Sequence, residues 1–340
     1  MRRTAKILAL AVSAFVACAA AHPARATDFS GKTITVVVSF APGGGYDAYG
    51  RLFAAHLSPH LPGRPAVIVK NMPGAGGLLG TNYLFNLAPR DGTTVGLVPQ
   101  TVVIAQLLGG STVKFDAHKF DWIGRINSNV EVEQTWYTSG IKTVADAKLT
   151  PVAVAGTGPA SSSVVFPHLL NDTIGTKFKV VSGYSGDSMA ALAMERGEVQ
   201  GMVRPWSVTK TVRPQWLRDN KINLIVQYAG KRHPELKGVP AVVDLAENEM
   251  QRKIFALYAS GSDIGRSIVA PPGLPVDVVQ ALRSAFDETV RDPAFLGDIK
   301  KKALDLDPLS GSELQATVQR AAAVPPDVIG PARKYYDNAK

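Results

Sequence analysis

The chain has 340 residues, of which 46% are hydrophobic and 19% are charged, and its formal net charge is +9. This length allows two domains with buried cores. The basic excess is small, because four positive charges lie in a predicted leader and their removal lowers the net charge to +5, so nucleic acid is not an expected partner. These four residues are Arg2, Arg3, Lys6 and Arg25.

Residues 1–26 have the pattern of a secretory signal peptide. Basic residues precede the apolar stretch Ile7–Ala21, and Ala24-Arg-Ala26 provides an A-x-A cleavage site. The apolar stretch is short for a membrane span. The pattern predicts a soluble, exported protein whose mature form begins near Thr27.

The single cysteine, Cys18, lies inside the predicted leader. The mature protein would therefore have no disulfide, no thiolate nucleophile and no cysteine-based metal site. Phe15-Val-Ala-Cys18 resembles a lipoprotein processing site only loosely, because it lacks the usual leucine, and we do not expect a lipid anchor at Cys18.

Strand-like and helix-like segments alternate after the leader. The strands predicted for the first part of the chain are Ile34–Phe40, Ala66–Val69, Thr93–Val98 and Phe120–Arg125. Helices are predicted over 47–57, 77–87 and 102–108. This order indicates a doubly wound α/β unit. The polar stretch Asn127-Ser-Asn129 is where we expect the chain to enter a second unit.

The second unit repeats the alternation. Its predicted strands are Pro151–Ala155, Phe178–Val181, Val199–Val203 and Leu224–Tyr228, with a helix over 189–197. A return to the first unit is expected through Ala259–Ile268, before a helix over 276–291. We therefore predict two lobes, 27–129 plus 263–340 and 130–262, each a doubly wound mixed sheet with flanking helices, joined by two hinge crossovers.

Glycine-rich loops follow two of the predicted strands. Gly43-Gly-Gly45 follows Ile34–Phe40 at the start of a helix, and Asn71-Met-Pro-Gly-Ala-Gly-Gly77 follows Ala66–Val69. Glycine lets a ligand approach the backbone, and the first N–H groups of a helix favour an anion. Neither loop has the Walker A lysine or the spacing of a dinucleotide fingerprint. The two loops predict one shared cleft for a small acid.

Ligands of doubly wound sheets lie beyond the carboxyl ends of the strands, and the polar and glycine-rich residues at those ends are the candidate ligand-binding residues. They are Pro42, Gly43, Gly44, Gly45, Tyr46, Asp47, Gly74, Ala75, Gly76, Gly77, Gln100, Thr157, Gly158, Ser161, Ser162, Ser185, Asp187 and Arg204.

Several of these residues have alternative roles. Asp47 is either a helix cap or an acceptor for a ligand donor, and Tyr46 either offers its hydroxyl or packs as an aromatic ring. The serine and threonine hydroxyls are equally suited to helix capping. Arg204 is suited to grip a carboxylate, or else stacks on Trp206 or pairs with an acid such as Asp47.

The order and spacing of these motifs resemble the substrate-binding proteins of tripartite tricarboxylate transporters, the Bug family of periplasmic receptors. The segments that carry the resemblance are Phe40-Ala-Pro-Gly-Gly-Gly-Tyr-Asp47, Asn71-Met-Pro-Gly-Ala-Gly-Gly77 with Gly80, Ala88-Pro-Arg-Asp-Gly92, Ala270-Pro-Pro-Gly-Leu-Pro275 and Arg291-Asp-Pro293.

The resemblance implies a two-lobed flytrap fold in the periplasm, no cofactor, and a small carboxylate delivered to the membrane permease subunits of a tripartite transporter. It leaves presentation of the ligand to a sensor kinase open. Gly156-Thr-Gly-Pro159 and Gly201-Met-Val-Arg-Pro-Trp206 depart from the family pattern, so the identity of the ligand stays open.

An enzyme is the alternative class. An exported α/β hydrolase or transferase would use Ser161 or Ser185 with a distant histidine. The sequence has neither a Gly-x-Ser-x-Gly elbow nor an H-E-x-x-H motif, and its histidines lack metal-ligand spacing. We therefore predict a binding protein without catalytic residues or a metal.

Overall fold

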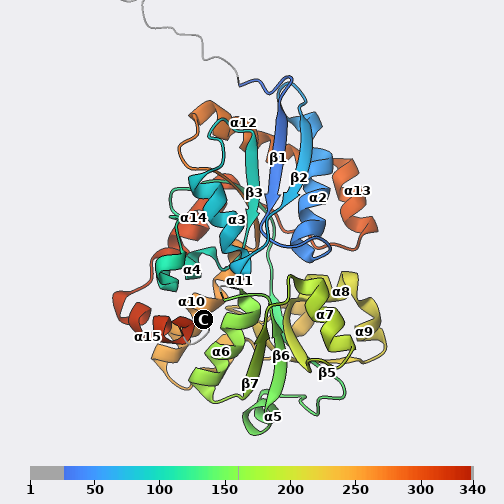
Figure 1. Ribbon diagram of the computed structural model, residues 1–340, viewed down its shortest axis with the longest axis vertical. Coiled ribbons are helices and arrows are strands. Elements are labelled where there is room, and N and C mark those ends of the chain that lie inside the picture. Colours follow the sequence, from blue (N-terminus) through green and yellow to red (C-terminus); the bar gives the residue numbers. More distant parts are fainter. Residues whose placement is uncertain (1–26, 160, 338–340) are drawn as a thin grey trace, which may run out of the picture.

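A computed structural model describes residues 27–159 and 161–337. Two α/β units are stacked along the long axis of the molecule (Figure 1). The predicted signal peptide and Cys18 lie outside the described residues. Within the described ranges, no helix has both the length and the apolar character needed to span a bilayer.

The first unit is built on a six-stranded sheet in the order β11-β4-β10-β3-β1-β2. Strand β1 is parallel to β2 and β3, whereas β10 is antiparallel to β3 and β4, and β11 is antiparallel to β4. The strands are β1 (Thr33–Val38), β2 (Ala66–Asn71), β3 (Thr94–Val98), β4 (Asp121–Asn127), β10 (Arg266–Ala270) and β11 (Leu309–Ser310).

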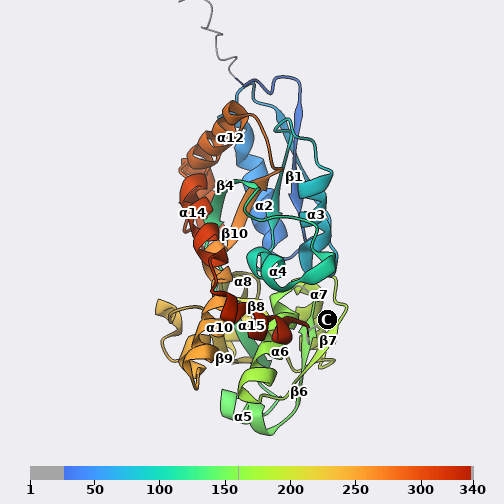
Figure 2. The same cartoon turned by 90° about the vertical axis from the view of Figure 1, so that its left-hand side faces the viewer.

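Helices cover both faces of this sheet (Figure 2). One face packs on α2 (Gly45–Leu57), α12 (Val276–Thr289) and α13 (Pro293–Lys301). The other packs on α3 (Leu78–Asn86), α4 (Val102–Leu108) and α14 (Gly311–Ala322). Val36 and Val38 of β1 face the first layer and Val37 faces the second, which explains why this strand is a continuous apolar run.

The second unit is built on a five-stranded sheet in the order β7-β6-β8-β5-β9. Strand β6 is parallel to β7 and β8, and β5 is antiparallel to β8 and β9. The strands are β5 (Glu131–Trp136), β6 (Val152–Gly156), β7 (Phe178–Ser182), β8 (Gly201–Pro205) and β9 (Ile222–Tyr228).

Two helical layers also enclose the second sheet. One contains α5 (Val144–Leu149), α6 (Ser162–Ile174), α10 (Glu249–Ala259) and α15 (Pro326–Asp337), and the other contains α7 (Asp187–Glu195) and α9 (Pro214–Arg218). Helix α8 (Trp206–Val212) continues from β8, and α11 (Gly261–Ile264) precedes β10. Short 3₁₀ helices occupy Ser58–His60, Ala75–Gly77, Gly110–Thr112, Pro234–Leu236 and Val242–Leu245.

Two mixed sheets with flanking helices confirm the predicted two-lobed fold class. The last helix differs from the prediction, which placed all residues after 263 in the first lobe. Helix α15 packs Val328, Ala332 and Tyr336 into the core beside α6 and α10 of the second unit (Figure 1). The apolar face of α15 is therefore buried against α6 and α10.

Two strands at the junction between the units, β5 and β10, were not predicted from the sequence, and neither was the two-residue strand β11. Strand β5 follows β4 after three residues and enters the second sheet, and β10 returns the chain to the first sheet. The segment 259–268 was expected to be only a crossover, but its last residues form a central antiparallel strand. Both strands begin at the junction between the two units.

Candidate ligand-binding cleft

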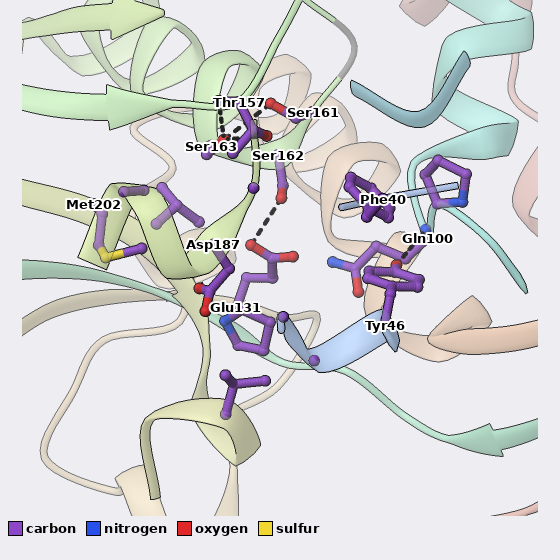
Figure 3. A pocket seen from close by; sticks show the side chains of 18 of the residues that line it. Phe40, Tyr46, Gln100, Glu131, Thr157, Ser161, Ser162, Ser163, Asp187 and Met202 are labelled. Atoms are coloured by element: carbon purple, nitrogen blue, oxygen red, sulfur yellow. Dashed lines mark hydrogen bonds between the residues drawn. The ribbon is translucent and has the colours of Figure 1, made fainter. Parts of the chain in front are cut away.

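A cavity lies between the two units and both contribute to its walls (Figure 3). The first unit supplies Phe40, Ala41, Gly44, Gly45, Tyr46, Pro99, Gln100, Thr101 and Arg266. The second supplies Glu131, Thr157, Ser161, Ser162, Ser163, Gly186, Asp187, Ala190, Met202, Val203, Pro205 and Val208. Most of the wall is apolar, and the charged groups are few.

The N-terminus of α2 reaches the cavity through Gly44 and Gly45. Side-chain bulk is excluded at Gly45, where an added Cβ would lie 2.5 Å from the Val208 side chain and 2.8 Å from Arg266 Nη2. The N–H groups of a first helical turn have no partner within their helix. This end of α2 therefore brings backbone donors to the cavity wall.

Asp47 braces the loop that carries these glycines. Its carboxylate accepts hydrogen bonds from the Gly43 amide, Arg51 Nε and Asn71 Nδ2, each at 2.9 Å. Burial raises the pKa of Asp47, but these hydrogen bonds together outweigh it and hold the pKa below the usual value. Asn71 also donates to the carbonyl of Phe40, so Asp47 and Asn71 tie the first loop to the end of β2.

Tyr46 is a packed wall of the cavity. Its ring lies 4.5 Å from the Phe40 ring, between centroids, and its hydroxyl accepts a hydrogen bond of 2.9 Å from the Gln100 amide (Figure 3). The Arg266 guanidinium lies 5.5 Å from the centre of the same ring. The hydroxyl therefore fixes the loop after β3.

Hydroxyl groups gather where β6 meets α6. Ser161 donates to the carbonyl of Gly158 at 2.7 Å, and its oxygen lies 2.9 Å from that of Ser163. Ser163 in turn accepts from the Thr157 amide. Ser162 instead donates to Glu131 at 2.8 Å (Figure 3). The hydroxyls of Ser161 and Ser163 hold the loop together, and that of Ser162 positions a carboxylate.

Two glutamates of β5 are buried beside the cavity. Burial raises the pKa of Glu131 to about 7, against the opposing effects of the Ser162 hydrogen bond and the Arg266 charge. Burial likewise raises the pKa of Glu133 to about 8, although Tyr228 donates to it at 3.1 Å. Only Glu131 lines the cavity. Because Glu131 and Glu133 are two residues apart in β5, both side chains lie on the same face of this strand, the face toward α6.

Arg266 is the buried cation of the cavity wall. It begins β10, is fully buried, and lies over the Tyr49 ring at 4.6 Å. Its Nη1 is 3.4 Å from Asn127 Oδ1 and from Ser207 Oγ. Its Nε and Nη2 have no hydrogen-bond partner in the described part of the chain.

Arg204 lies behind the wall. Its guanidinium pairs with Asp187 at 2.9 Å and stacks 5.1 Å from the centre of the Trp216 ring. The sequence suggested Asp47 and Trp206 as its partners, and both suggestions are wrong. Asp187 faces the cavity with its charge compensated by Arg204 from behind.

The structure brings eight of the candidate residues to the cavity wall. They are Gly44, Gly45, Tyr46, Gln100, Thr157, Ser161, Ser162 and Asp187. The other candidates are placed nearby but not on it. They are Pro42, Gly43, Asp47, Gly74, Ala75, Gly76, Gly77, Gly158, Ser185 and Arg204.

The second glycine loop meets the opposite unit instead of the cavity. An added Cβ at Gly158 would lie 2.7 Å from the amide nitrogen of Gly76 and 3.2 Å from Ala75. The backbones of the two units therefore touch at this point. Ser185 is exposed on the loop before α7 and does not line the cavity, although the next residues, Gly186 and Asp187, do.

Sequence reasoning missed Glu131 and Arg266, which stand on the unpredicted strands β5 and β10. A usable signal was present in Glu131-Val-Glu133, where acids alternate within a β-branched stretch, and in Arg266, which precedes the apolar run Ile268–Ala270. Within the ranges that the structure describes, no group of three or more histidine, cysteine or acidic residues is arranged to hold a metal ion.

Residues 51–323 match the protein family described as tripartite tricarboxylate transporter family receptor, TctC. The chain belongs to the TctC family. This TctC-family receptor is 27% identical over 320 residues to the UPF0065 protein in the gbd 5' region of Cupriavidus necator, an alignment that covers 88% of this chain and 87% of the relative.

Solved structures of similar shape include the periplasmic binding protein BugD, with a TM-score of 0.70, 21% identity, and coverage of 90% of this chain and 97% of BugD. MatC (Rpa3494) from Rhodopseudomonas palustris with bound malate has a TM-score of 0.66, 22% identity, and coverage of 87% and 98%. The family resemblance seen in the motifs is thus confirmed. The family to which this chain belongs is thus a family of transporter receptors.

Proposed function

We propose that this receptor captures a small organic carboxylate between its two lobes in the periplasm and passes it to the permease subunits of a tripartite transporter. Membership of the TctC family supports the transporter partner. The malate bound to the similarly folded MatC supports the class of ligand.

Arg266 is the observation that carries the proposal. Leaving a buried N–H donor without a partner costs roughly 1–3 kcal/mol, and more for a charged group. Two such donors of Arg266 belong to the cavity wall, near the N-terminal glycines of α2. A carboxylate accepts from a guanidinium through two parallel hydrogen bonds and would satisfy both.

Contacts between the lobes support capture by closure. Ser188 of α7 donates to the carbonyl of Gly43 at 2.7 Å, and Gly158 abuts Gly76. We infer that residues 128–130 and the segment before β10 act as the hinge, since the chain passes there between the two sheets. With this hinge, the first lobe begins at residue 27 and the second lobe begins at residue 130.

The serine hydroxyls do not support the alternative of a hydrolase. A serine nucleophile needs a base within hydrogen-bond reach. The hydrogen bonds of Ser161 go to Gly158 and Ser163, and no histidine is among its partners in the described residues. Ser185 is exposed and stands off the cavity wall.

A thermal-shift panel tests the proposal. Mono-, di- and tricarboxylates and aromatic acids are added to the purified protein. A ligand present at about 100 times its Kd stabilises the fold by about 2.7 kcal/mol, which raises the Tm by several degrees. Arg266→Gln should abolish the shift while circular dichroism shows a folded protein. Folded wild-type protein that responds to no carboxylate would contradict the proposal.

A further inference from the structure

Some buried polar groups of the cavity wall lack a partner. Ten buried side-chain atoms have no hydrogen-bond partner in the described residues, and three of them belong to residues that line the cavity, Gln100 Nε2 and Arg266 Nε and Nη2. The others belong to residues that do not line it, namely Asn127, Asn129, Glu133, Gln134, Arg204 and Thr211. Buried polar groups are almost always paired, so Gln100 and Arg266 are placed to meet a polar ligand or water.

The two cavity-lining groups nearest the hinge have opposite charges, and no hydrogen bond or ion pair joins them in the described residues. Arg266 donates hydrogen bonds from Nη1 to Asn127 Oδ1 and to Ser207 Oγ. Glu131 takes its hydrogen bond from Ser162 through one oxygen, and its other oxygen points toward Gln100 across the cavity (Figure 3). One charge comes from each lobe, and both residues line the cavity.

The charges of the residues at the cavity wall determine which ligand charges would be compensated. Asp187 is neutralised by Arg204, which leaves one cation, Arg266, and one acid, Glu131. A dicarboxylate would bury two negative charges against one positive charge and beside Glu131. Uncompensated buried charge is strongly unfavourable. A ligand with one anionic and one cationic end leaves no charge unpaired.

We propose that the cleft selects a zwitterionic amino acid, whose carboxylate Arg266 binds and whose ammonium group Glu131 accepts. Apolar residues of the cavity wall, Met202, Val203 and Val208, would contact its carbon skeleton. This inference rests on the proposed function, because it assumes a carboxylate ligand, and it names Glu131 as the residue that decides which carboxylate binds.

Binding of such a ligand should depend on pH. Glu131 is faced by Arg266 from β10, Asp187 from α7, Tyr46 from α2 and Glu133 with Tyr228 on its own side of the sheet. An ammonium group requires the ionised carboxylate. With the free carboxyl half-protonated at about pH 7, the affinity for the zwitterion should rise about tenfold between pH 6 and 8.

Matched ligands of equal length make the experiment decisive. Isothermal titration calorimetry compares ω-amino acids of three to six carbons, and alanine, with the monoacids and diacids of the same length. The amino acid that fits best should bind at least about tenfold more tightly than its matching monoacid and diacid. Glu131→Gln keeps an acceptor for Ser162, and it should remove that preference and the pH dependence.

Glu133→Gln is the control, because Glu133 is buried on the same strand but does not line the cavity. It should leave the ranking of ligands unchanged. The inference is overturned if the diacid binds more tightly than the amino acid, or if Glu131→Gln leaves the ranking unchanged; the carboxylate receptor then stands. If no acid of any kind binds, the proposed function and this inference both fail.

Discussion

The hydroxyl of Ser188 donates a 2.7 Å hydrogen bond to the carbonyl oxygen of Gly43, 145 residues earlier in the chain. Ser188 lies in the first turn of α7, which packs on the second sheet, whereas Gly43 belongs to the glycine loop of the first unit. The bond joins the two lobes at the edge of the cavity, where Gly186 also approaches Ala41. It can form only when the lobes are together.

Ser188→Ala should weaken ligand binding without unfolding either lobe. A hydrogen bond of this kind contributes about 0.5–1.5 kcal/mol, so the affinity should fall roughly twofold to tenfold. Calorimetry on the best ligand measures this change. Ser312→Ala, an exposed serine at the start of α14, is the control and should bind normally. Equal affinities in all three proteins would show that the contact does not contribute to closure.

Gly158→Ala should hold the lobes apart. The new Cβ would lie 2.7 Å from the Gly76 amide nitrogen, and that contact exists only in the closed arrangement. We expect ligand affinity to fall by about tenfold or more, because a steric overlap with backbone costs at least ~1.4 kcal/mol. The Tm of the ligand-free protein should fall by less than the loss of binding free energy would suggest.

Gly183→Ala is the control that distinguishes backbone strain from contact between the lobes. Gly183 also has a positive φ, +112° against +148° at Gly158, but an added Cβ there meets no atom of the described residues within 4 Å. Both variants share the backbone strain, and only Gly158→Ala meets the other lobe. If both reduce ligand affinity equally, contact across the cleft is not the cause.

Asp47→Asn should destabilise the first lobe by about 1–3 kcal/mol at pH 7. The new amide would place donors against the Gly43 amide, Arg51 and Asn71, which now donate to the carboxylate. Because hydrogen bonding lowers the folded pKa, the carboxylate stabilises the fold above about pH 4 and this stabilisation is lost at lower pH. Urea unfolding at pH 7 and pH 3 should therefore show a gap from wild type that narrows at pH 3. A gap that stays constant would exclude this role of the charge.

Glu133→Gln should stabilise the protein at alkaline pH. The folded pKa is raised to about 8, so the free energy of unfolding of the wild type should decrease as pH rises from about 4.5 to about 8. The neutral amide removes this dependence and can still accept from Tyr228. We expect a gain of about 1–3 kcal/mol at pH 8 and little change at pH 5, measured by urea unfolding. Loss of stability at pH 8 would contradict the buried, protonated carboxyl.

The glycine loops illustrate how much of the site the sequence predicts. Gly43-Gly-Gly45 at a strand-to-helix junction predicts a backbone anion site, and Gly44 and Gly45 do reach the cavity wall. Gly74–Gly77 carries the same local signal, yet it faces Gly158 of the other lobe. The sequence marks both loops as close-approach points, but it does not say whether a ligand or a backbone approaches.

Local sequence patterns determined the alternation of strands and helices, the two α/β lobes and the family, because apolar periodicity and turn residues act over a few neighbouring positions. The tertiary structure alone decided that Glu131 and Arg266 face one cavity from opposite lobes and that Arg204 pairs with Asp187. These relationships join residues far apart in the chain. They arise when β5 and β10 pair as antiparallel strands at the junction, and the local pattern of each strand does not specify which strand it pairs with.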